Sequence, residues 1–102
     1  MTIETAPLTP SLLGFWTRCL RTTQHWSQDA LAAASGLTTR TIQRIEAGEP
    51  STISTRRSLA RGLGYDNPDV FDDPEFARMV RQFIEVAQGQ KVKDEYPRSE
   101  ER

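Results

Sequence analysis

The sequence predicts an all-α fold in which several short helices are followed by a longer amphipathic helix. Two observations support this prediction. Residues with short polar side chains that can cap a helix recur just before segments with helical periodicity, and apolar residues recur three and four positions apart. In addition, no alternating apolar and polar pattern is long enough for a β-strand.

Each of the first three predicted helices begins after a capping residue. In the first, a Thr-Pro pair places proline at the first helical position, where its missing N–H costs nothing. In the second, an acid in the first turn favours the positive end of the helix dipole, and a glycine ends the segment. The predicted helices span about 10–22, from Ser27 to Gly36, and from Thr38 to about Ala47.

The rest of the chain supports two further helices and a short turn. A fourth helix lies within 51–63, although the pattern leaves its start open by several residues, and Asp73-Pro74 begins a longer helix that ends near Gly89. The inward-facing residues of the fourth helix are predicted to be Ile53, Leu59, Ala60 and Leu63, and the turn contains Val70 and Phe71. We therefore divide the chain into a flexible arm (1–8), a helical domain (9–72), an amphipathic helix (73–89) and a disordered tail (90–102).

Length and composition indicate one small soluble domain. With 102 residues, 36% of them hydrophobic, the chain can form one modest core. Neither a run of about 20 apolar residues nor a signal peptide is present, so we expect no membrane association and a cytoplasmic location. His25 lacks partners at metal-ligand spacing, and neither a phosphate-binding glycine loop nor a nucleophile motif occurs. We expect no enzyme activity, no cofactor and no metal.

Charge is distributed unevenly along the chain. The formal net charge is -1, but residues 1–64 carry seven arginines and four acids, a balance of +3, whereas the remainder balances at -4. Arginine is suited to bidentate contacts with phosphate or guanine. This asymmetry predicts that the first two thirds of the chain contains any nucleic-acid-binding surface.

The second and third helices are predicted to form a helix-turn-helix. Gly36 allows a tight turn because glycine adopts positive φ without steric cost, Ala32 lets the helices approach closely, and Leu37 packs between them. At about 100° per residue, Thr41, Ile42 and Ile45 fall on one side of the third helix. The opposite face, an arc of about 140°, contains Thr39, Arg40, Gln43, Arg44 and Ala47.

The polar face of the third helix matches the chemistry of a DNA major groove. Arginine binds guanine O6 and N7, glutamine binds adenine N6 and N7, and threonine contacts either a base or a thymine methyl group. We predict that Thr39, Arg40, Gln43 and Arg44 contact bases. Gln28 and Thr38 stand at helix N-termini, where free N–H groups and the helix dipole favour phosphate. A polar face exposed to solvent explains the same residues on their own, but it does not explain the adjoining turn and caps.

The chain resembles the Cro and phage-repressor-like (XRE) helix-turn-helix family over about residues 12–65. The resemblance rests on the stretches WSQ, LA, SGL and TTRTIQRIEAG within 26–48, and on LARGLG at 59–64. It implies a five-helix DNA-binding domain over 9–72, with the amphipathic helix as an addition. It further implies a sequence-specific regulator of transcription, in particular a repressor, that binds double-stranded DNA at a palindromic operator.

The resemblance also implies roles for particular residues. Arg21 would pair with Glu46 and tie the first helix to the end of the third, and the loop before the fourth helix would contact phosphate through Ser51 and Thr52. Two positions depart from the family pattern: Arg56 stands where a core leucine is usual, and Glu49 places an acid in a loop that is often basic. Arg57 is a further candidate for phosphate contact, although a solvated helix face explains Arg56, Arg57 and Arg61 equally well.

Two alternatives remain open at the level of the sequence. The apolar stripe of the last helix either packs on its own domain or forms a homodimer interface; its members are Phe76, Met79, Val80, Phe83 and Ile84. The second alternative concerns function. A chain with this fold can also be a protein-interaction module, such as an antitoxin-like or co-regulator protein, whose acidic C-terminal part engages a regulatory protein partner.

Overall fold

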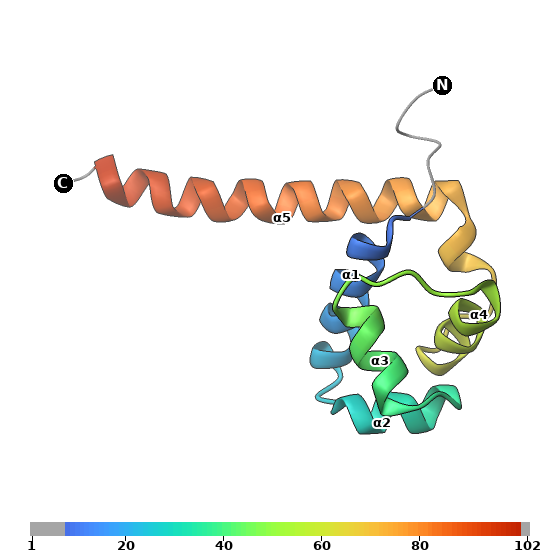
Figure 1. Cartoon of the computed structure of the whole chain (residues 1–102). Helices are drawn as coiled ribbons and strands as arrows, with labels where there is room; N and C mark the ends of the chain where they lie inside the picture. Colours follow the sequence, from blue (N-terminus) through green and yellow to red (C-terminus); the bar gives the residue numbers. More distant parts are fainter. Residues whose placement is uncertain (1–7, 101–102) are drawn as a thin grey trace.

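The computed structural model describes the backbone of residues 8–100 and the side chains of residues 8–87. Within these limits the chain is all-helical, as predicted, and contains no strand (Figure 1). The helices are α1 (Pro10–Thr23), α2 (Gln28–Ser35), α3 (Thr39–Glu46), α4 (Ile53–Gly62) and α5 (Pro74–Glu100), with a 3₁₀ turn, η2 (Val70–Asp72), between α4 and α5. None of the described helices is long and apolar enough to cross a membrane.

The capping residues define the starts of the first four helices. In each case a Ser or Thr in the extended conformation accepts a hydrogen bond from the backbone N–H three residues further on, which satisfies a donor that the helix itself cannot. The pairs are Thr9 with Leu12 at 3.2 Å, Ser27 with Ala30 at 3.0 Å, Thr38 with Thr41 at 3.1 Å, and Thr52 with Thr55 at 3.1 Å. The cap at Thr52 fixes the helix start that the sequence left open.

The turn between α2 and α3 has the conformation predicted from the sequence. Gly36 is left-handed, with φ of 73°, and the Leu37 N–H donates to the Ala32 carbonyl oxygen over 3.0 Å. Ala32 is buried and Leu37 packs against the core. This turn sets α3 across α2 with its polar face outward.

The core lies between the five α-helices and η2, and all of them contribute buried apolar side chains to it. Its fully buried side chains include Leu31, Ile42, Ile45, Leu59 and Phe71. Ile53 is an exception to the prediction for α4: it is 52% exposed because it occupies the first residue of the helix, outside the packed turns. Leu59 and Ala60 are buried and Leu63 packs against the core, as predicted.

Helices α1 and α3 pack so closely that no side chain fits between them at Gly14. A Cβ atom on Gly14 would overlap the carbonyl oxygen of Ile45, and it would lie 3.1 Å from that of Glu46. Glycine therefore sets the distance between α1 and the end of α3.

The apolar stripe of α5 is divided between the core and the surface. Phe76 packs on Trp16, with ring centroids 6.0 Å apart, and Val80 and Ile84 are buried in the chain's own domain. The prediction that these three residues form a dimer surface is therefore wrong, because α5 lies against α1 and η2. The exposed members of the helix are Met79 at 44%, Phe83 at 52% and Val86 at 60%.

Helix α5 also extends further than predicted. It does not end near Gly89 but continues to Glu100, so the segment expected to be disordered is helical over most of its length. The predicted arm at 1–8 lies outside the described residues except for Leu8, which packs against the core.

Candidate nucleic-acid interface

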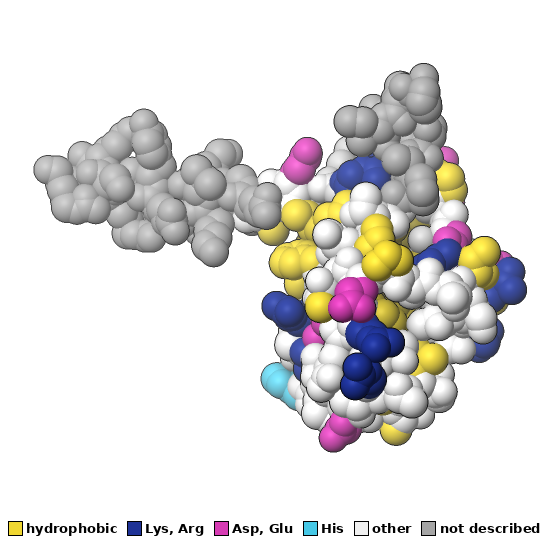
Figure 2. Space-filling model, viewed as in Figure 1, with side chains coloured by type: hydrophobic (Ala, Val, Ile, Leu, Met, Phe, Trp, Pro, Cys, Tyr) yellow, Lys and Arg dark blue, Asp and Glu magenta, His cyan; other side chains and the backbone are white. Residues whose placement is uncertain are grey.

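The outer face of α3 is an open polar surface. Arg40, Gln43 and Arg44 are exposed, and Thr39 is half-buried. Together with Ala47 and Glu49 the three exposed side chains line an open hollow. Basic side chains project over α3 in the space-filling view, with an acidic side chain close by (Figure 2).

Two of the predicted base contacts have acidic partners. The hydroxyl of Thr39 donates to Oδ1 of Asp29, in the first turn of α2, over 2.5 Å. Nε of Arg44 lies 3.9 Å from Oε1 of Glu49, and both side chains are more than half exposed, so this pair is weak. By contrast, the side chains of Arg40 and Gln43 have no hydrogen bond or ion pair to another residue that the structure describes.

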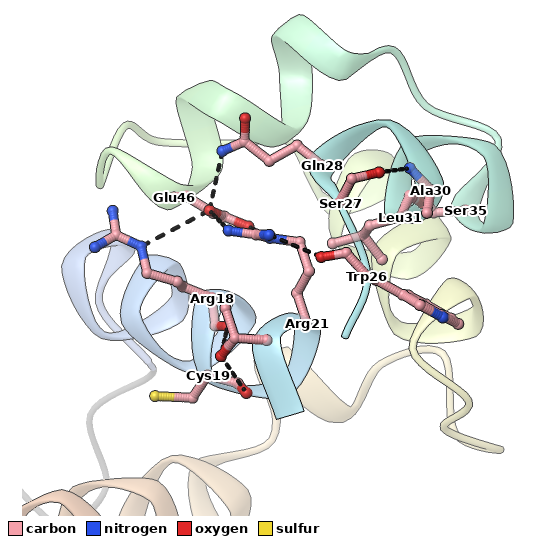
Figure 3. A network of polar contacts seen from close by, with 11 residues as sticks. Arg18, Cys19, Arg21, Trp26, Ser27, Gln28, Ala30, Leu31, Ser35 and Glu46 are labelled. Atoms are coloured by element: carbon pink, nitrogen blue, oxygen red, sulfur yellow. Dashed lines mark hydrogen bonds and ion pairs between the residues drawn. The ribbon is translucent and has the colours of Figure 1, made fainter. Parts of the chain in front are cut away.

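Glu46 is the centre of a buried network that holds the end of α3 against α1 and α2 (Figure 3). Its side chain is 1% exposed. Arg21 donates to it twice, from Nε over 2.6 Å and from Nη2 over 2.9 Å, and also donates from Nη1 to the Trp26 carbonyl oxygen over 2.9 Å. The hydrogen bond to Glu46 raises the pKa of Arg21 above its ordinary value, so this arginine remains charged. The pair implied by the family resemblance is thus present in the molecule.

Gln28, a predicted phosphate contact, belongs to the same network. Its amide Nε2 donates to Oε1 of Glu46 over 3.1 Å. A glutamine amide has two N–H groups, so one remains for a ligand. Arg18 lies at the edge of the network: its Nε is 3.8 Å from Oε1 of Glu46, and its side chain is 61% exposed. The geometry fixes Gln28 in orientation while leaving it a donor.

The predicted phosphate contacts Thr38 and Thr52 are both helix caps. Thr38 and Thr52 cap α3 and α4, and each hydroxyl also donates to a threonine hydroxyl three residues on, at 3.0 Å and 3.1 Å. Ser51 is half-buried, and its carbonyl oxygen accepts from Nη1 of Arg56.

Two of the three arginines of α4, Arg56 and Arg57, are paired with acids that the sequence did not single out as partners. Arg56 occupies the position where a leucine was expected. Its guanidinium forms an ion pair with Asp72, with Nη2 2.9 Å from Oδ1, and donates a hydrogen bond to the Ser51 carbonyl oxygen. Arg57 donates from Nε to Oδ1 of Asp69 over 2.6 Å, and this hydrogen bond raises the pKa of Arg57. The candidate phosphate contact Arg57 is therefore engaged within the chain itself.

The acids Asp29, Asp69 and Asp72 are the functional neighbours that sequence reasoning missed. For Asp69 and Asp72 the sequence signal was the excess of acids after residue 64, which does not say which arginine each acid meets. Asp29 was interpreted only as an acid that favours the helix dipole. Among residues 8–87, no group of three histidine, cysteine or acidic side chains is placed to hold a metal ion.

Comparison with known proteins gives one family match. Residues 20–66 match the family model described as helix-turn-helix. The matched segment begins near the end of α1, contains all of α2, α3 and α4, and stops before η2. It therefore includes the network around Glu46 and the outer face of α3. No curated protein matches the chain.

Proposed function

We propose that the chain binds double-stranded DNA in a sequence-specific manner and regulates transcription, because residues 20–66 match the helix-turn-helix family model and resemble the phage-repressor-like domains. In this proposal α3 enters the major groove, where Thr39, Arg40, Gln43 and Arg44 contact bases. Gln28, Thr38, Ser51 and Thr52 contact phosphates, and Arg57 does so after leaving Asp69.

The observation that best supports the proposal is the pair of unengaged side chains in the middle of the α3 outer face. Arg40 and Gln43 are exposed, and no described residue forms a hydrogen bond or ion pair with either side chain. Their donors and acceptors match base edges. The network around Glu46 holds α3 in place in the free protein. Binding therefore does not have to supply the conformational entropy lost when this surface is ordered.

Alanine substitutions on α3 test the assignment. Arg40→Ala or Gln43→Ala should each weaken binding to a selected duplex by about 1–3 kcal/mol and relax preference at one base pair. Gln28→Ala should weaken binding to all duplexes similarly, because a phosphate contact carries no base information. The measurement is fluorescence anisotropy with the selected duplex and with a scrambled one.

Two substitutions on α5 provide matched controls. Arg78 and Gln82 are exposed on α5. Their replacement by alanine removes an arginine and a glutamine side chain, as the α3 variants do. They should leave affinity and preference unchanged. If Arg40→Ala and Gln43→Ala behave like these controls, α3 does not contact bases.

We further propose that two copies bind a palindromic operator, with half-sites one helical turn apart. Support comes from the exposed residues Met79, Phe83 and Val86, which stand four and three positions apart on one side of α5. Exposed apolar stripes of this kind commonly mark protein contacts.

Sedimentation equilibrium tests the dimer. The wild type should have twice the monomer mass, and Val86→Asp should be monomeric. Val86 is the most exposed of the three residues, so its replacement should not disturb the domain core. A monomeric wild type at concentrations well above those used for DNA binding would rule out the homodimer.

As a regulator the chain would act as a repressor, by occupying its operator and excluding the polymerase. The same apolar stripe also favours a second candidate, a protein-interaction module with the helix-turn-helix fold. Salt dependence separates the two. A steep fall of log K with log salt indicates phosphate contacts, whereas no duplex binding even at low salt favours the interaction module.

A further inference from the structure

The hydrogen bond between Thr39 and Asp29 joins the first turns of α3 and α2 at the surface of the domain. Thr39 Oγ1 lies 2.5 Å from Asp29 Oδ1. Asp29 is exposed and Thr39 is half-buried, so both remain accessible. No arginine or lysine in the described part of the chain forms an ion pair with Asp29. Its carboxylate therefore keeps acceptor capacity that no described residue uses.

This contact changes what Thr39 can do. A threonine hydroxyl has one proton and two lone pairs, and an ionised aspartate only accepts. Because the proton of Thr39 is donated to Asp29, the two side chains together present acceptors and no donor. The neighbouring Arg40, by contrast, presents donors and no acceptor.

The exposed edges of the four bases respond differently to such a surface. In the major groove, cytosine offers the N4 amino group and adenine the N6 amino group, whereas guanine offers O6 and N7 and thymine offers O4. An acceptor-only pair bonds the amino groups of cytosine or adenine. It leaves the acceptors of guanine or thymine facing other acceptors, without a proton between them.

We propose that the Asp29–Thr39 pair determines specificity for a base that carries an exocyclic amino group, cytosine or adenine, opposite the N-terminal turn of α3. This inference rests on the proposed function, because it requires α3 to lie in the major groove. It adds Asp29, a residue of α2, to the base-reading set, and it gives Thr39 an acceptor role in place of a donor role.

The acceptor role differs from a purely structural role for Asp29. An acid in the first turn of α2 stabilises the helix through its dipole, and that effect is blind to the base opposite. A negative charge at the interface also lowers the affinity for every duplex to the same extent. Only the acceptor role makes the identity of one base depend on Asp29 and on Thr39 together.

The test is selection of bound duplexes from a random pool by the full chain and by three variants. The wild type should enrich cytosine or adenine over guanine or thymine by about tenfold or more at one position. Asp29→Asn should reduce that ratio to near one, because the amide can also donate to O6 or O4. Thr39→Val should reduce the same ratio through loss of the hydroxyl. Glu85→Gln removes a charge from an exposed residue of α5 and serves as the matched control.

The outcomes separate this inference from the proposed function. Failure of the wild type to enrich any duplex at low salt would overturn the proposed function and the inference with it. Two other outcomes would overturn the inference alone. In the first, the wild type enriches a defined site, but Asp29→Asn selects the same bases at every position. In the second, the position that Thr39→Val alters is a guanine or a thymine in the wild-type site. Circular dichroism checks that each variant is folded. If Asp29→Asn is unfolded, the base preference of Thr39→Val tests the inference in its place.

Discussion

Glu46 ties the end of α3 to both α1 and α2. It is a buried carboxylate that accepts hydrogen bonds from Arg21 and Gln28, and these residues belong to α1 and α2. A buried charge of this kind is tolerated because its partner compensates it, and removal of the partner leaves the desolvation cost without compensation.

Arg21→Ala should therefore reduce the free energy of unfolding by about 3–5 kcal/mol, measured by urea denaturation. Arg21→Lys should lie between this variant and the wild type, since lysine keeps the charge but loses the two-pronged geometry. The control is Arg18→Ala. Arg18 is 3.8 Å from the same carboxylate but 61% exposed, so the loss should be below about 1 kcal/mol. Equal losses for Arg18 and Arg21 would contradict the importance of burial.

Thr17 presents the opposite case, a buried hydroxyl without a partner among the described residues. The side chain is 0% exposed, and its Oγ1 forms no hydrogen bond with any residue that the structure describes. Thr17→Val replaces the hydroxyl with a methyl group of similar size, and should leave the free energy of unfolding unchanged or raise it by about 1 kcal/mol. A loss of more than 1 kcal/mol in thermal or urea unfolding would show that the hydroxyl has a partner in solution.

At the scale of elements, the packing of α1 against α3 depends on Gly14. Helix propensity alone predicts that Gly14→Ala stabilises the protein by about 1 kcal/mol. Close approach predicts the opposite, because the new Cβ overlaps the Ile45 carbonyl oxygen. We expect a net loss of about 1–3 kcal/mol in urea unfolding, together with weaker duplex binding, since α3 must shift. A stabilised variant would show that α1 can move away without cost.

The sequence predicted those features of the elements that are determined by interactions between residues close together in the chain. The starts of the helices at Ser27 and Thr38, and the left-handed Gly36, follow from interactions between residues a few positions apart, and the sequence shows these. The burial of Phe76 and Val80 could not be decided, because periodicity reveals an apolar face but not what covers it. The same limit applies to the candidate site. The side chains on the outer face of α3 were identified, whereas the partners Asp29 and Asp69 depend on how distant segments meet.

At the scale of the whole molecule, the basic excess of the first two thirds is reduced by acids from elsewhere in the fold. Arg56 and Arg57, both on α4, are paired with Asp72 and Asp69 around η2. Duplex binding through Arg57 therefore requires exchange of a carboxylate for a phosphate.

Asp69→Asn removes the carboxylate that competes with a DNA phosphate for Arg57, so it should favour the contact of Arg57 with DNA. If Arg57 contacts a phosphate in the complex, the variant should bind all duplexes more tightly than the wild type at low salt, and Arg57→Ala should lower the slope of log K against log salt by about one. The measurement is a salt titration of the wild type and both variants with one duplex. Identical slopes for wild type and Arg57→Ala would place Arg57 outside the interface.

The shortness of α2 and α3 has a consequence for the kinetics of the molecule. Each helix has eight residues, whereas an isolated helix shorter than about 12–15 residues is marginal in water. Neither helix can persist once the core around Ile42 and Leu31 has opened. The backbone amides within α3 should therefore exchange with deuterium at the rate set by global unfolding, in step with those of α2. The surface proposed to read DNA would then exist only while the whole domain is folded, with no partly ordered state in which recognition survives.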